Sequence, residues 1–148
     1  MSIAASSHET KALSQLKIAV LHSILNDEPF QNSGVILRFP DLPFILNQQD
    51  IFLVDEDIEN AINVENLNRL VQPVAERTIK ENVLHSGKTI FFKFQSKKEE
   101  SDRLLLRLNA NIFSASDART TTLSSLILKF KKEQNSWKLI DSPSFLSA

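Results

Sequence analysis

The spacing of apolar residues in the first part of the chain is that of a helix. Between residues 6 and 27, apolar side chains recur every three or four positions and therefore share one helix face. These residues are Leu13, Leu16, Val20, Leu21, Ile24 and Leu25. Ser6 and Glu9 have the spacing of a capping box, which predicts the start of the helix, and Pro29 marks its end. The breadth of the apolar stripe predicts that the helix packs against a sheet.

The middle of the chain has a more broken pattern. Residues 34–39 and 50–55 each contain a short apolar run that predicts a strand, and residues 40–49 fit one or two helical turns. Over residues 55–83, an imperfect helical period predicts a second helical region. We expect a kink or a break at Pro73, because proline cannot continue a helix. The acidic residues at the start of this region are interpreted as favourable partners of a helix dipole.

From Lys88 to the end of the chain, apolar and polar residues alternate. Three long segments and a closing hairpin follow one another, separated by polar turns. A period of two predicts antiparallel strands with one face on the core. The core-facing residues of the three segments are Ile90, Phe92, Phe94, Leu104, Leu106, Leu108, Leu126, Leu128 and Phe130. The predicted fold is therefore α+β, with N-terminal helices packed in a curved antiparallel sheet of three to five strands. It forms one domain, residues 1–148, with a flexible tail over residues 1–8.

The opposite face of these strands is basic and carries a few apolar side chains. Phe91, Leu105 and Ile127 lie on this face, with Lys129 among them. An apolar strip on an exposed sheet face favours symmetric pairing, so we expect a homodimer or another protein partner here. Single-stranded nucleic acid would need several stacking aromatic residues, and this face has one, so nucleic acid is not an expected partner.

Charge is distributed unevenly along the chain. The net charge is −1, yet residues 1–66 carry three basic and ten acidic residues, and residues 67–148 carry fourteen basic and eight acidic ones. In a single domain, the two halves are expected to compensate each other. The chain has no signal-peptide pattern and no apolar run near the roughly 20 residues that span a membrane. A cytoplasmic location without a membrane partner is therefore expected.

The sequence has no motif for catalysis, nucleotide binding or metal binding. It lacks cysteine, and its two glycines are too few for a phosphate-binding loop. The acidic segment 55–60 is similar to the start of a calcium loop, but Asn60 and Asn66 occupy the positions where that loop needs glycine and glutamate. The three histidines have no metal-binding spacing. We therefore expect no cofactor, no metal and no catalytic residue.

The closing segment, residues 136–140 with the sequence SWKLI, resembles the last strand of many members of the nuclear transport factor two-like superfamily. The order of predicted helices and strands is also similar to theirs. The resemblance implies a sheet wrapped around the N-terminal helix as a cone with an apolar pocket. Ligand-pocket candidates on its inner face are Phe92, Phe94, Leu106, Leu128 and Trp137. Trp137 can instead anchor the closing hairpin in the core, and this is the interpretation that we favour.

The same superfamily includes ketosteroid isomerases, whose pocket combines an aspartate base with tyrosine and protonated-aspartate donors. This chain has no tyrosine, and the inner face of its predicted strands carries no titratable side chain. Asp50, Asp117 and His22 are the titratable residues that could approach a pocket. The favoured hypothesis is a non-catalytic binding or protein-interaction domain. A carrier of a small apolar ligand and an enzyme of the same fold with an unrecognised pocket site are the alternatives.

Overall fold

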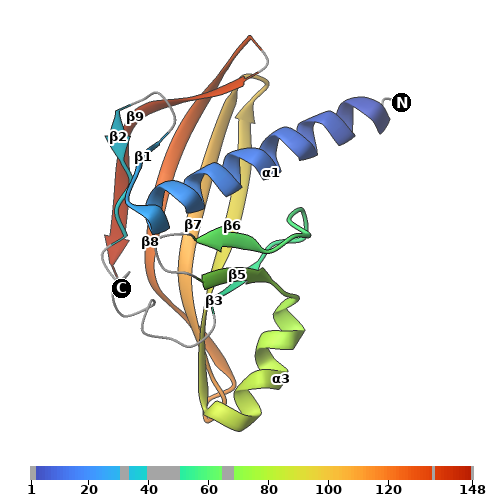
Figure 1. Ribbon diagram of the computed structural model, residues 1–148, viewed down its shortest axis with the longest axis vertical. Helices are drawn as coiled ribbons and strands as arrows, with labels where there is room; N and C mark the ends of the chain where they lie inside the picture. Colours follow the sequence, from blue (N-terminus) through green and yellow to red (C-terminus); the bar gives the residue numbers. More distant parts are fainter. Residues whose placement is uncertain (1–2, 31–33, 40–50, 65–68, 135, 148) are drawn as a thin grey trace.

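The computed structural model describes residues 3–30, 34–39, 51–64, 69–134 and 136–147. Its frame is a curled mixed sheet of seven strands in the order β4-β5-β3-β6-β7-β8-β9 (Figure 1). In chain order, the elements are α1 (Ile3–Asn26), β1 (Pro29–Phe30), β2 (Val35–Ile36), β3 (Ile51–Val54), β4 (Ile62–Val64), β5 (Arg69–Pro73), α3 (Glu76–Ser86), β6 (Lys88–Glu100), β7 (Arg103–Ser114), β8 (Arg119–Glu133) and β9 (Ser136–Ser147). β1 and β2 form a separate two-stranded sheet.

Helix α1 confirms the helix predicted for residues 6–27, although it begins earlier, at Ile3. The capping box predicted at Ser6 is wrong, because Ser6 lies inside the helix. α1 runs diagonally across the inner face of the long strands (Figure 1). Its buried apolar side chains are those of the predicted stripe: Leu16, Val20, Leu21, Ile24 and Leu25. The helix therefore packs on a sheet, as its broad apolar face requires.

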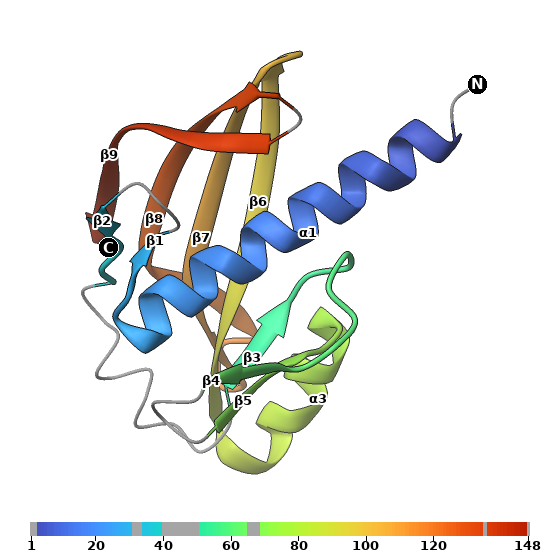
Figure 2. The same cartoon turned by 45° about the horizontal axis from the view of Figure 1, so that its top comes forward.

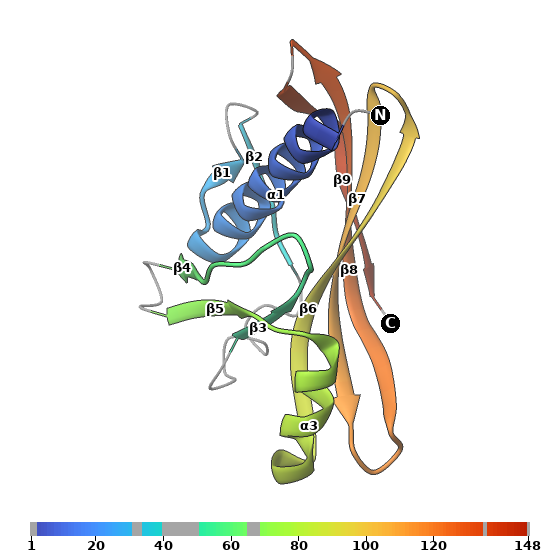
Figure 3. The same ribbon diagram turned by 90° about the vertical axis from the view of Figure 1, so that its right-hand side faces the viewer.

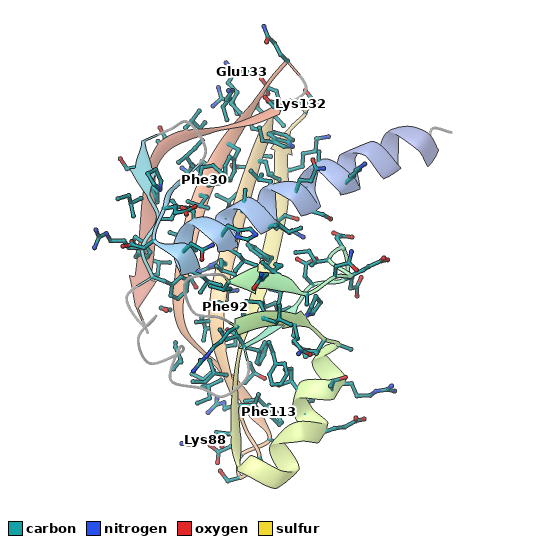
Figure 4. The ribbon with its side chains drawn as sticks, in the orientation of Figure 1. Phe30, Lys88, Phe92, Phe113, Lys132 and Glu133 are labelled. Atoms are coloured by element: carbon teal, nitrogen blue, oxygen red, sulfur yellow. The ribbon has the colours of Figure 1, made fainter. Side chains whose placement is uncertain are left out.

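The main core lies between α1 and the inner face of β6, β7 and β8. All nine core-facing residues predicted from the alternating pattern are buried, which confirms the pattern. The chain around β1 and β2 adds two aromatic rings to this core. The Phe30 ring lies 5.9 Å from the Phe130 ring, and the Phe39 ring lies 5.8 Å from the Phe92 ring, centroid to centroid. Figure 4 shows Phe30 and Phe92 among the side chains near α1.

Residues 62–64 and 69–73, predicted to be helical, form strands β4 and β5 instead. Ile62 and Val64 are buried and the residue between them is exposed, which is the alternation of a strand. Val71 of β5 lies between Ile62 of β4 and Ile51 of β3, so three β-branched side chains meet across three strands. The helical prediction was wrong because so short an alternation does not exclude a helix, and it is the pairing of β5 with both β4 and β3 that makes these segments strands.

Helix α3 connects β5 to β6, and β3 lies between these two strands, parallel to both. α1 and α3 lie on opposite sides of β3 and β5 (Figure 3). α3 packs Ile79 against Phe91 and Phe113 in a second apolar cluster, and Figure 4 marks Phe113 beside this helix. Phe91 is only 1% exposed, so the sheet is covered on both faces at this end.

The sheet is larger, and the helices are fewer, than predicted. The four long antiparallel strands agree with the sequence pattern, but β3, β4 and β5 extend the sheet to seven strands and make it mixed. Two helices are found among the described residues, and the helical turns predicted for residues 40–49 lie outside them. β9 bends sharply (Figure 2), with a shift in its pairing to β8 and a φ of 60° at Asp141. The fold is still of the α+β class, with its sheet curled into a half-barrel.

Candidate functional site

A hollow of about 720 Å³ opens where strand β3 ends. β3 pairs with β5 as far as Leu53 and with β6 as far as Val54. β6 continues beyond that point, with β7 as its only partner among the described strands. Residues of α1, of the segment after β3 and of the start of α3 surround the space that is left beside β6. The carboxyl ends of parallel strands are common ligand sites, because the segments leaving the strands form the walls of a crevice.

The lining of this hollow combines apolar side chains, of which Ile58 and Phe94 are buried, with charged ones. The apolar part consists of Val54, Ile58, Pro73, Val74, Ala75 and Phe94. The charged part consists of Asp55, Glu56, Asp57, Glu59, Glu76, Lys17 and Lys93. Five carboxylates therefore face two ammonium groups, so the hollow carries a negative net charge. We call it the acidic hollow.

Lys17 of α1 is the buried charge at the base of the acidic hollow. It is 4% exposed, and its Nζ lies 2.8 Å from Oδ2 of Asp55 and 3.5 Å from Oδ2 of Asp57. The Nζ atom also lies 5.8 Å from the centre of the Phe94 ring, within cation–π range. The Asp55 side chain is 3% exposed. An ammonium group buried without a partner would be very costly, so the two carboxylates are what makes this position tenable.

The segment after β3 is fixed in place by α1. The Asp57 amide donates a hydrogen bond of 2.9 Å to Oδ1 of Asp55, which closes a local turn. The Ser14 hydroxyl donates a second bond of 2.9 Å to the Asp57 carbonyl oxygen. Ser14 and Lys17 are three residues apart and therefore lie on the same side of α1. The prediction that these acidic residues start a helix is wrong, because they follow strand β3 and turn towards α1.

The remaining charges of the acidic hollow are more exposed. Lys93 donates a hydrogen bond of 3.1 Å to Glu76 at the start of α3, and both side chains are partly exposed to solvent. Glu56 and Glu59 are exposed, and neither takes part in an ion pair between described residues. These two carboxylates therefore face solvent and are not paired with a lysine or arginine among the described residues.

The sequence did not identify the acidic hollow as a site. The signal that it contained was Lys17, a charged residue within the apolar stripe between Leu16 and Val20. A lysine on the buried face of a helix requires a carboxylate partner, and the chain offers a cluster of carboxylates at residues 55–59. The partnership joins positions about forty residues apart, as the separation of Lys17 and Asp57 illustrates. Periodicity alone does not connect them.

Four of the five ligand-pocket candidates are buried in the core formed by the described residues. Phe92, Leu106 and Leu128 are buried in the main core under α1. Phe94 belongs to the same core and also lines the acidic hollow. Trp137 is half-buried and packs against the edge of the core, and Lys132 Nζ lies 6.0 Å from the centre of its ring. Trp137 thus contacts the core as favoured from the sequence, while keeping part of its surface in solvent.

The predicted interface residues do not form one open surface, because α3 covers one of them. Phe91 is buried beneath this helix, so the proposal that it lies on an exposed interface is corrected. Leu105 and Ile127 are half-buried and Lys129 is exposed on the face opposite α1, with Leu105 directly across from Lys129 in the register. The apolar strip on this face is therefore smaller than expected. The homodimer stays a prediction.

Two of the titratable candidates named from the sequence, His22 and Asp117, do not line the acidic hollow. His22 is on α1, where its Nδ1 lies 3.1 Å from Nδ2 of Asn26. Asp117 is exposed in the turn between β7 and β8, and Asp50 lies outside the described residues. Within the described ranges, no group of three or more histidine, aspartate and glutamate side chains is arranged to hold a metal ion.

Comparison of the chain with protein-family models, with curated proteins and with solved structures yields no match. Membership of the nuclear transport factor two-like superfamily therefore stays a prediction from resemblance. Of the helices that the structure describes, none is both long and apolar enough to cross a membrane.

Proposed function

We propose that the protein is a non-catalytic interaction domain that binds a basic segment of a partner protein in the acidic hollow. The observation that supports this proposal is the charge imbalance of a hollow that also has an apolar lining. A lysine or arginine side chain has an apolar stem and a cationic head. The stem fits against Phe94, Ile58 and Val74, and the head fits among the carboxylates.

The position of the unpaired carboxylates supports recognition of a cation from solvent. Glu56 and Glu59 are exposed at the mouth, whereas Asp55 is already held by Lys17 and by the Asp57 amide. An incoming cation would meet the exposed carboxylates first, and the field of the whole cluster would steer it inwards. The walls belong to α1, the segment after β3 and the start of α3. Because that segment is tied to α1 by the Lys17–Asp55 ion pair and the Ser14–Asp57 hydrogen bond, little chain entropy is lost on binding.

Binding is favoured over catalysis because the buried ionic groups are already occupied. A general acid or base must exchange a proton with a substrate within hydrogen-bond reach. Lys17 is shared between two carboxylates, and Asp55 accepts from Lys17 and from a backbone amide. The inner-face residues proposed to bind an apolar ligand belong to the core formed by the described residues, and the acidic hollow is not lined mainly by them. A non-catalytic role is also consistent with the resemblance to the nuclear transport factor two-like superfamily, which includes non-catalytic members.

Titration calorimetry with a short, capped peptide rich in arginine and lysine tests this function. The Glu56→Gln/Glu59→Gln variant should bind the peptide about 2- to 30-fold more weakly, because each exposed ion pair contributes roughly 0.2–1 kcal/mol. Binding should also weaken as sodium chloride is added, since exposed charges are screened. A capped peptide with glutamate in place of the basic residues should not bind.

The matched control is Glu100→Gln/Glu133→Gln, which removes two exposed carboxylates that do not line the hollow. Figure 4 shows Glu133 at the far tip of β8. This variant should bind the basic peptide as the unchanged protein does. Equal loss in both double variants would mean that the peptide responds to overall charge, and absence of binding by the unchanged protein would refute the proposal.

A further inference from the structure

A second hollow lies on the outer face of the sheet, the face opposite α1. It has a volume of about 410 Å³ and lies between the start of α3 and strands β6, β7 and β8. Its lining is polar throughout and includes Lys93, Arg107, Asn109, Asn111 and Ser125. We call it the Arg107 groove. It meets the acidic hollow at the Lys93–Glu76 ion pair, which borders both.

Amide and hydroxyl side chains form a ladder of two separate hydrogen-bonded sets along the floor of the groove. The Ser125 hydroxyl donates to Oδ1 of Asn109 over 2.6 Å, and Nδ2 of Asn109 donates to Oε1 of Gln95 over 3.1 Å. One pair further along β7, the Thr122 hydroxyl donates to Oδ1 of Asn111 over 2.9 Å. Each of these three amide oxygens therefore already accepts a hydrogen bond from the protein. The ladder holds the side chains in place with their acceptors engaged.

Arg107 supplies an unused donor to this groove. Its Nε is buried and has no hydrogen-bond partner, and no carboxylate among the described residues forms an ion pair with it. Its neighbours across the strands are Gln95 and Ile127, neither of which carries a negative charge. A buried donor on a charged group is costly when unpaired. An acceptor supplied by a ligand would remove that cost.

The surroundings of the groove are positively charged. Arg103, Lys131 and Lys138 stand directly opposite one another on β7, β8 and β9, and Glu100 of β6 is the one carboxylate in this row, opposite Arg103. Lys129 lies on the same face, two residues along β8 from Lys131. None of the ion pairs between described residues joins the acidic half of the chain, residues 1–66, to this face. These cations, with Arg107 and Lys93, outnumber the carboxylates Glu76 and Glu100 near the groove, which favours an anion.

We propose that the Arg107 groove binds a small oxyanion, the phosphate or carboxylate group of a ligand. The planar guanidinium of Arg107 is suited to two oxygens of such a group, and Lys93, whose ammonium group is paired with Glu76, lies at the border of the groove. The amide groups of the ladder, Asn109 and Asn111, line the floor beneath it. This site is separate from the proposed peptide-binding function and does not depend on it.

Inorganic phosphate and acetate are the probes, each titrated into isotope-labelled protein at constant ionic strength and followed by amide resonances. Saturable shifts are expected in β7 and β8 around Arg107, Asn111 and Ser125. Tighter binding of phosphate would identify a phosphate group as the natural ligand, and tighter binding of acetate a carboxylate. The Arg107→Gln variant should bind the preferred anion at least about tenfold more weakly, since a charged hydrogen bond is lost.

Lys129→Gln is the matched control, because Lys129 is an exposed cation of the same face that does not line the groove. It should change the affinity by less than about threefold, as expected for an exposed charge. Arg107→Lys keeps the charge without the planar fork and should show an intermediate loss, and it decides the matter if Arg107→Gln does not fold. The proposal would be overturned if Arg107→Lys and Lys129→Gln lost the same affinity for the anion. It would also be overturned if sodium chloride shifted the same resonances as much as phosphate or acetate does.

Discussion

Replacement of Lys17 by methionine should lower the free energy of unfolding by about 3–5 kcal/mol. Methionine retains the apolar stem that packs in α1 and removes only the ammonium group. At an effective dielectric constant of about 20, two charges separated by the 2.8 Å between Lys17 Nζ and Asp55 Oδ2 attract by roughly 6 kcal/mol. The desolvation of both groups offsets part of that attraction. The large loss arises because the Asp55 carboxylate, 3% exposed, stays buried without its cation.

Urea denaturation followed by circular dichroism measures this change, with an unaltered m-value as evidence that the same surface is exposed on unfolding. Lys11→Met is the matched control, since Lys11 is an exposed residue of the same helix. It should change the free energy of unfolding by no more than about 0.5 kcal/mol. A loss below about 1 kcal/mol in Lys17→Met would refute the reasoning, because that is the value of a solvent-exposed pair.

The double variant Lys17→Met/Asp55→Asn tests the cause of the loss. Asparagine keeps an oxygen that can accept from the Asp57 amide and removes the orphaned charge. The double variant should therefore be more stable than Lys17→Met by about 1–2 kcal/mol, because the buried charge and not the lost attraction dominates the penalty. A double variant less stable than either single variant would contradict this explanation.

Three further results are expected. In the same urea assay, Trp137→Ala should lower the free energy of unfolding by about 1–3 kcal/mol, which is less than for a fully buried ring because Trp137 is only half-buried. The control Leu146→Ala, at an exposed position of the same strand, should lower it by less than about 1 kcal/mol. If the outer face forms a homodimer, Leu105→Lys should give a monomer by sedimentation velocity, and an unchanged protein that already sediments as a monomer would contradict the dimer. Glu76→Gln should strengthen phosphate binding and weaken basic-peptide binding about 2- to 5-fold each, because Lys93 loses its carboxylate partner and the acidic hollow loses a negative charge. If calorimetry shows that both affinities rise or both fall, the claim that the Lys93–Glu76 pair borders both hollows is contradicted.

The predictions that succeeded depend on patterns longer than about ten residues. The alternation that begins at Lys88 continues through three strands, so its buried face could be named residue by residue. The apolar stripe of α1 has the same advantage, because several turns repeat one spacing. In both elements, the period is a local property of the backbone, and the burial of one face follows from it.

The predictions that failed concern elements whose conformation depends on distant partners. β4 and β5 are three and five residues long, and their apolar residues fit a helix as well as a strand until β3 and β6 complete the sheet. Phe91 was expected on an open face because it alternates with core residues. The crossing of α3 places Ile79 over it, which an alternating pattern in β6 does not reveal.

The sequence by itself determined the long helix, the four antiparallel strands and the excess of cations on one sheet face, since each is encoded by neighbouring residues. Only the tertiary structure decided which charges are paired. Lys17 Nζ lies 2.8 Å from Asp55, whereas Arg107 has a buried nitrogen without a hydrogen-bond partner. In the sequence the two residues are similar, because each is one cation in a regular pattern, Lys17 in a helical one and Arg107 in an alternating one. The physical reason is that desolvation and pairing depend on groups brought together from distant parts of the chain. Both candidate sites consist of groups that come from different parts of the chain, and the Lys93–Glu76 pair lies between the two sites.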